Sequence, residues 1–395
     1  MKQALSILLL LQLAALHSSI AGMELFSWLL FVGVVAYRLK RGEHLDFPLW
    51  RPGALLLLAV LISLLVNPWL KPFWFQFGFM RWIFLLYGYY WALEIVWSEA
   101  FSLRLLTLWN VMLVVAGLYA VAQCFWGVDP IRPGTQVVIF EQWGQYKGTG
   151  YFAMKATGLF SLSLTYAYST GQSLFAVGLP SFQTRLKPWA WGARLVAMLG
   201  VFSSMSRGAW LGTVLCALIP PFVGLSMRWR VVFVGGVIAA TAAALAYFGL
   251  DHSSVMRFDI WRAYGQMFLE HPFFGIGLLQ GDLLMPDYYT QLGIVQPFVG
   301  HAHNVILQWA AGAGIFALAA YIYLAGALLL RAWRLRLYSP WGWSLFLAQV
   351  FMHFGGLTEC NFFDGEVLHM TVFLWAMTLV QEKIHRGARR LVDVP

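Results

Sequence analysis

Charged side chains are scarce in this sequence. Asp, Glu, Lys and Arg make up 11% of the 395 residues, whereas a soluble domain carries about 25%. Hydrophobic residues make up 60%, and the mean hydropathy is +0.69. This number of charged residues is too small to cover a water-exposed surface. The composition therefore excludes a soluble globular protein and predicts an integral membrane protein.

Cysteine is also rare, and its spacing excludes a metal site built from cysteines. Cys124, Cys216 and Cys360 are the three cysteines, and they form no C-x-x-C pair. Cys124 and Cys360 both fall near the expected outer surface, where a disulfide is one alternative. Unpaired thiols are the default expectation.

Several catalytic motifs are missing. The sequence contains no Walker A motif, no G-x-G-x-x-G in a βαβ context, no H-E-x-x-H and no G-x-S-x-G. Nucleotide-driven chemistry and hydrolase triads are therefore not supported.

Long apolar segments are what the sequence does have, since a membrane span needs about 20 mostly apolar residues. Candidate spans cover residues 3–21, 23–38, 53–69, 80–98, 104–124, 153–178, 188–204, 208–226, 230–249, 303–329, 341–358 and 366–382. No linker and no fixed-period repeat divides them. We therefore predict an all-α, polytopic membrane protein of about twelve transmembrane helices, forming a single integral membrane domain over residues 1–395.

The net charge of +9 reflects membrane topology. If the N-terminus is cytoplasmic, seventeen Lys and Arg fall on the cytoplasmic side and eight on the other, with Arg194 inside a span. This is the positive-inside pattern, so no nucleic-acid partner is expected. Both termini are then cytoplasmic, and residues 250–302 form a long outer loop. The first apolar segment could be a signal peptide, but an uncleaved helix is favoured because another apolar run follows at once.

The outer loop at 250–302 collects cations and imidazoles. Residues 257–270 have apolar residues at helical spacing, which predicts an amphipathic helix on the membrane surface. Arg257 and Arg262 on this helix could grip a pyrophosphate through charge-assisted bonds. The alternative is a surface ion pair with Asp259.

A third arginine lies in the tight outer turn before residue 208. Ser206 and Arg207 stand where positive charge is scarce, and the hydroxyls and free N–H groups of the next helix favour an anion-binding site. Snorkelling explains most arginines at helix ends, but a charge at the membrane edge is costly and usually functional.

Histidines end the loop. A neutral imidazole at His303 is suited to accept a hydroxyl proton, and Asn304 or Gln308 could orient it or bind sugar. His301 and His303 could instead be metal ligands, but the pair lacks the third ligand that zinc requires.

Four ionisable residues surround the last outer segment: Glu359, Asp364, Glu366 and His369. We interpret the carboxylates as solvated helix-end groups rather than as an acidic metal site. Glu94, inside a span, is expected to pair with a neighbour; a transport role is the alternative.

Taken together, four motifs resemble the O-antigen ligase superfamily. They are S-R-G-A-W-L-G at 206–212, Arg257 four residues before Trp261, E-H-P-F-F-G-I-G at 270–277, and His303-Asn304 followed by Leu307-Gln308. Residues 148–167 are similar to the ligase branch. The resemblance implies a metal-independent, cofactor-free glycosyltransferase of the bacterial inner membrane with its active site facing the periplasm. The family's essential arginines map to Arg207 and Arg257, and its histidine maps to His303.

The resemblance further implies an inverting transfer of a glycan from undecaprenyl pyrophosphate to a lipid A-core sugar hydroxyl, with membrane lipids around the protein. Catalytic roles then fall to His303, Arg207 and Arg257, and substrate-binding roles to Ser206, Arg262, His301, Asn304 and Gln308. An O-antigen or exopolysaccharide polymerase and a protein O-oligosaccharyltransferase are alternatives within the superfamily. A lipid-linked glycan transporter is the alternative of another class; the lack of repeats and of ionisable residues deep in several spans disfavours it.

Overall fold

The computed structural model describes residues 1–395 except 69, 128, 133–154, 249–251, 296–297 and 393–395. Its regular elements are all helices within that part of the chain. The first half contains α1 (Lys2–Ala15), α2 (Ile20–Lys40), α3 (Trp50–Val66), α4 (Phe73–Gly78), η1 (Phe79–Arg81), α5 (Trp82–Val96), α6 (Glu99–Trp126), α7 (Ser163–Ala176) and α8 (Gly178–Phe182). The second half contains α9 (Lys187–Ser203), α10 (Arg207–Gly224), α11 (Met227–Phe248), α12 (His252–Glu270), α13 (Gly281–Leu292), α14 (Val305–Leu335), α15 (Pro340–Gly355), η3 (Asn361–Phe363) and α16 (Gly365–Val392).

A helix lies in each of the twelve ranges predicted as spans. Among the described residues, four helices are both long and apolar enough to cross a membrane: α2, α6, α10 and α14. Helices α1 and α3 are apolar but shorter. The all-α membrane class is therefore confirmed, while the number of twelve spans stays a prediction.

Helices α5 and α16 form the centre of the bundle. Twelve of the 15 residues of α5 are buried, and α16 packs along it through Trp375 and other buried side chains. A helix that is apolar on all sides must be surrounded by protein or lipid, and α5 is covered by α1, α2 and α16. Helices α7 and α15 pack together, as do α6 and α9.

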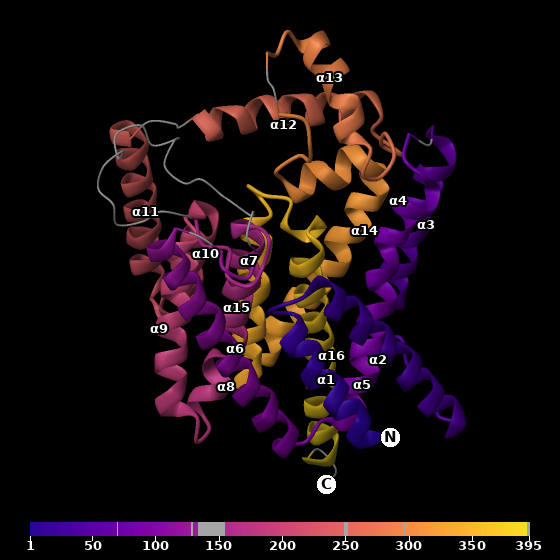
Figure 1. The fold of residues 1–395 in the computed structure, drawn as a ribbon, viewed down its shortest axis with the longest axis vertical. Helices are drawn as coiled ribbons and strands as arrows, with labels where there is room; N and C mark the ends of the chain where they lie inside the picture. The colour runs from indigo at the N-terminus through magenta and orange to yellow at the C-terminus, as the bar shows by residue number, and fades with distance from the viewer. Residues whose placement is uncertain (69, 128, 133–154, 249–251, 296–297, 393–395) are drawn as a thin grey trace.

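Helix α12 lies across one end of the bundle with α13 beside it, and both termini lie at the opposite end (Figure 1). We call the end with α12 and α13 the loop end and the other the terminal end. The helix predicted over 257–270 is confirmed inside α12. Its buried face, which includes Ile260, Tyr264 and Met267, packs with α13 and the start of α14. The contact of α12 with a membrane surface stays a prediction.

Helix α14 is broken at Gly314, where the backbone has φ 79° and ψ −178°. The segment after α12 enters this break. Ile276 N donates to Ala311 O at 2.8 Å, and Ile315 N donates to Pro272 O at 2.8 Å. The glycine-rich motif at 270–277 thus satisfies backbone groups that the break would leave unpaired.

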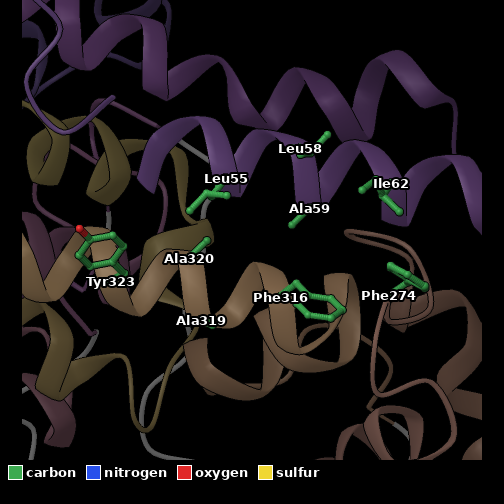
Figure 2. A pocket seen from close by; sticks show the side chains of 9 residues that line it. All are labelled: Leu55, Leu58, Ala59, Ile62, Phe274, Phe316, Ala319, Ala320 and Tyr323. Atoms are coloured by element: carbon green, nitrogen blue, oxygen red, sulfur yellow. The ribbon is translucent and has the colours of Figure 1, made fainter. Parts of the chain in front are cut away.

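An apolar pocket of about 510 Å³ lies between α3 and α14 (Figure 2). Its wall is formed by Leu55, Leu58, Ala59, Ile62, Phe274, Phe316, Ala319, Ala320 and Tyr323. None of the predicted functional residues lines it.

The remaining sequence expectations concern thiols and Glu94. All three cysteines are free and buried, so the Cys124–Cys360 disulfide is not formed and the default of unpaired thiols is confirmed. Glu94 is paired as expected: Arg38 Nη2 and Lys383 Nζ each lie 2.7 Å from its carboxylate.

Candidate functional site

Glu359, in the segment after α15, lies at the centre of the candidate site. Its side chain is only 6% exposed. Arg257 Nη2 contacts Oε1, and His303 Nδ1 lies 2.7 Å from Oε2. We call Arg257, His301, His303 and Glu359 the Glu359 cluster. It joins α12, the start of α14 and the segment after α15.

Short hydrogen bonds hold these segments together. Asn304 caps α14 by accepting from Leu307 N at 3.0 Å, and its Nδ2 donates to Leu357 O at 2.9 Å. Val305 N donates to Gly356 O at 2.7 Å. The first turn of α14 is therefore tied to the segment that carries Glu359, which fixes His303 against the carboxylate.

The backbone of His303 is left-handed, with φ 47°. Few residues with a side chain adopt this conformation, and such strain concentrates at functional sites. In this conformation the His303 ring makes two contacts. Its Nδ1 lies beside Glu359, and its centroid lies 4.3 Å from the centroid of the His301 ring. The strain is consistent with a constraint on where the imidazole points.

The carboxylate determines which nitrogen of His303 carries the proton. An ionised carboxylate only accepts hydrogen bonds, so Nδ1 of His303 must be the donor to Glu359. The neutral ring then keeps its lone pair on Nε2. This arrangement orients the imidazole and prepares Nε2 to accept a proton.

His301 belongs to the cluster through its ring. The residue as a whole is exposed, but the ring packs against Phe298 and His303. Loss of water around the ring lowers the pKa of His301 to about 4. Its imidazole is therefore neutral near pH 7.

The turn that carries Arg207 adjoins the cluster through Tyr168 of α7. A Cβ placed on Gly208 would lie 2.6 Å from the Tyr168 hydroxyl and 3.1 Å from Thr358 Oγ1. The charges of Glu359 and Arg257 both act on that hydroxyl. Arg207 is the exposed first residue of α10. It directly precedes Gly208, which lies against Tyr168 and Thr358.

Ser206 lies in the same turn. Its Oγ is buried and interacts with the hydroxyl of Tyr168. It does not cap α10 with its side chain. The Ser206 and Tyr168 hydroxyls thus form a polar pair beside Gly208.

Three predicted binding residues have other contacts. Arg262 is 60% exposed and lies 3.8 Å from Asp259, which places it in the surface pair considered as the alternative. Gln308 is buried, and its Oε1 accepts from Ala302 N at 2.9 Å. Asn304 is the helix cap described above. The amides of Asn304 and Gln308 therefore orient the histidine segment, which was one of their two predicted roles.

The expectation of solvated carboxylates around the last outer segment is wrong for two of the three. Glu359, Glu366 and His369 are buried, because α16 and its neighbours pack over them. Asp364 is half-buried and caps α16 by accepting from Glu366 N at 3.1 Å, as a carboxylate before a helix should.

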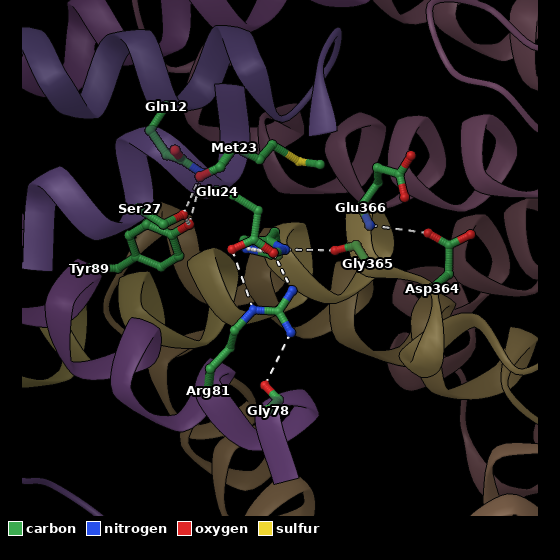
Figure 3. Close-up of polar contacts among 11 residues, drawn as sticks. Gln12, Met23, Glu24, Ser27, Gly78, Arg81, Tyr89, Asp364, Gly365 and Glu366 are labelled. Carbon is green, nitrogen blue, oxygen red and sulfur yellow. Dashed lines mark hydrogen bonds and ion pairs between the residues drawn. The ribbon is translucent and has the colours of Figure 1, made fainter. Parts of the chain in front are cut away.

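A second polar group lies beside this cap. Figure 3 shows the ion pair between Glu24 and Arg81 near Gly365 and Glu366. His369 Nδ1 lies 2.7 Å from Gly365 O, and its Nε2 lies 3.8 Å from Glu24. These contacts join α2, η1 and α16.

The main residue missed from the sequence is Glu359 as the partner of Arg257 and His303. A signal was present, because a carboxylate in the apolar stretch before α16 is costly unless paired. Tyr168 was also missed; a tyrosine inside an apolar helix gives no such signal.

Among the described residues, one group of three side chains could hold a metal ion: His301, His303 and Glu359, whose ligand atoms all lie within 4.8 Å of one another. Glu359 is thus the third potential ligand, which the His301 and His303 pair lacked in the sequence analysis.

Comparison with known proteins gives a family for the central part of the chain. The family model described as O-Antigen ligase matches residues 192–322. This range holds Arg207, Arg257 and His303, and it ends before Glu359. No curated protein matches the chain. The match over residues 192–322 supports the O-antigen ligase superfamily, and the apolar helices indicate a multi-pass membrane protein.

Proposed function

We propose that this protein transfers a glycan from undecaprenyl pyrophosphate to a sugar hydroxyl of lipid A-core, on the periplasmic face of the bacterial inner membrane. The observation that carries the proposal is the Glu359 cluster with the Arg207 turn beside it. An imidazole, an arginine and a buried carboxylate meet at the loop end of a membrane protein, and the turn that carries Arg207 lies beside them. The family supports glycosyl transfer as the reaction class.

In the proposed step, the acceptor hydroxyl oxygen attacks the anomeric carbon of the donor sugar. The new C–O bond forms as the bond from that carbon to the pyrophosphate oxygen breaks, which inverts the centre. The hydroxyl proton passes to Nε2 of His303, and undecaprenyl pyrophosphate leaves. Such general-base help contributes about 10²–10⁴ in rate.

Arg207 and Arg257 bind the pyrophosphate and neutralise the charge that develops on it. Arg257 donates one N–H to Glu359. A guanidinium has five N–H donors, so others remain for the pyrophosphate. In a site shielded from water, cations placed in advance act more strongly than in solution. The pyrophosphate linkage supplies the energy, so no nucleotide is needed.

The test is transfer by purified protein reconstituted with an undecaprenyl-pyrophosphate glycan. Arg207→Ala and Arg257→Ala should each reduce transfer by about 10²-fold or more, because each removes a placed cation. Arg207→Lys should also fail if a bidentate grip is needed. Arg104→Ala, an exposed arginine on α6, is the matched control and should retain full activity.

Wild-type activity in either alanine variant would remove that arginine from the mechanism. The acceptor is identified in the same assay by offering lipid A-core, a second lipid-linked glycan or a secreted protein in turn. Product size then separates a ligase from a polymerase and from a protein O-oligosaccharyltransferase.

A further inference from the structure

The ligand set in the Glu359 cluster has the chemistry of a zinc site. Imidazole nitrogens and one carboxylate oxygen are three of the donors that Zn²⁺ prefers. The three ligand atoms of His301, His303 and Glu359 lie within 4.8 Å of one another. Around a tetrahedral ion they would lie about 3.3 Å apart, so small side-chain rotations would close the site.

The fold already directs the two rings to one place. His301 and His303 flank Ala302, and their ring centroids lie 4.3 Å apart with planes at 52°. Glu359 comes from another segment, which Cys360 holds close to α14 through Gln308 at 3.6 Å. The donors therefore come from two segments that are fixed independently of any ion.

Arg257 opposes metal binding. Its guanidinium contacts Glu359 Oε1, so an ion must compete for the carboxylate and then lie beside a positive charge. An ion at His303 would also occupy the lone pair that receives the proton in the proposed reaction. The ion would therefore compete with Arg257 for the Glu359 carboxylate. By occupying the His303 lone pair, it would inhibit the proposed transfer.

We propose that His301, His303 and Glu359 form an inhibitory site for a divalent transition-metal ion such as Zn²⁺. Three protein ligands leave the fourth position to water. Binding of the ion stands on the ligand geometry alone, whereas inhibition rests on the proposed function of His303. The two parts are therefore measured separately.

Binding is measured by titrating EDTA-treated, purified protein with Co²⁺, followed by visible absorption, and by Zn²⁺ competition against the bound Co²⁺. One ion per chain is expected. His301→Ala and Glu359→Gln should each weaken binding by at least about tenfold. Arg257→Ala should tighten it, because the competing cation is gone. His44→Ala, an exposed histidine between α2 and α3, should bind as the wild type does.

Inhibition is measured on the EDTA-treated protein, which should transfer glycan fully before any ion is added. Zn²⁺ should then inhibit the wild type, and fresh EDTA should restore it. Absence of stoichiometric binding, or equal binding by wild type and His301→Ala, would overturn the site; His301→Gln repeats this test if the alanine variant fails to fold. Binding without inhibition would overturn only the inhibitory role and would count against His303 as the base.

Discussion

At the scale of the residue, Glu359 is the positioning group of the site. It contacts Arg257 and His303 with its two oxygens while only 6% of the side chain is exposed. Glu359→Ala leaves a half-buried cation without its partner, so we expect kcat to fall by about 10²-fold or more. Glu359→Asp should restore part of this loss, and Glu359→Gln should lower kcat more than it raises KM.

A purely structural role for Glu359 predicts a different pattern. Activity would then follow the amount of folded protein, and kcat per folded molecule would be unchanged in all three variants. Size-exclusion profiles beside kcat and KM separate the two. Glu366→Gln is the comparison, since Glu366 is also a buried carboxylate of the same region but makes no contact with the cluster that the described structure records.

At the scale of the element, the break in α14 depends on Gly314. A Cβ there would lie 2.1 Å from Phe273 O, and its backbone conformation is one that only glycine adopts readily. Gly314→Ala should therefore cost about 1–3 kcal/mol plus the clash, and it should lower the thermal unfolding midpoint. Gly326→Ala in the same helix has open space and should be neutral or stabilising. Equal midpoints for the two variants would refute this account of the break.

At the scale of the whole molecule, the positive-inside pattern predicts that the loop end faces the periplasm. Val295 is 99% exposed near that end, and Leu337 is 71% exposed in the turn after α14. In intact cells, a membrane-impermeant maleimide should label Val295→Cys and leave Leu337→Cys unlabelled until the membrane is opened. The native cysteines are buried, so background labelling should be low. The reverse pattern would invert the topology and place the candidate site in the cytoplasm.

Local properties of the sequence determined much of this protein. Low charge and long apolar runs specify helices in a membrane, because an isolated backbone in lipid must satisfy its own hydrogen bonds. Helix α12 followed from the spacing of its apolar residues, and the resemblance to the O-antigen ligase family followed from motifs around Arg207, Arg257 and His303. Each of these signals can be read within a short window of residues.

Only the tertiary structure decided what surrounds those residues. Glu359 lies 102 residues from Arg257 and 56 from His303, and its position in sequence fits a solvated helix end equally well. The packing of α14, α15 and α16 buries its carboxylate, and burial makes a paired cation and an oriented imidazole necessary. The same packing supplies the third metal ligand, since the meeting of distant segments depends on the whole fold.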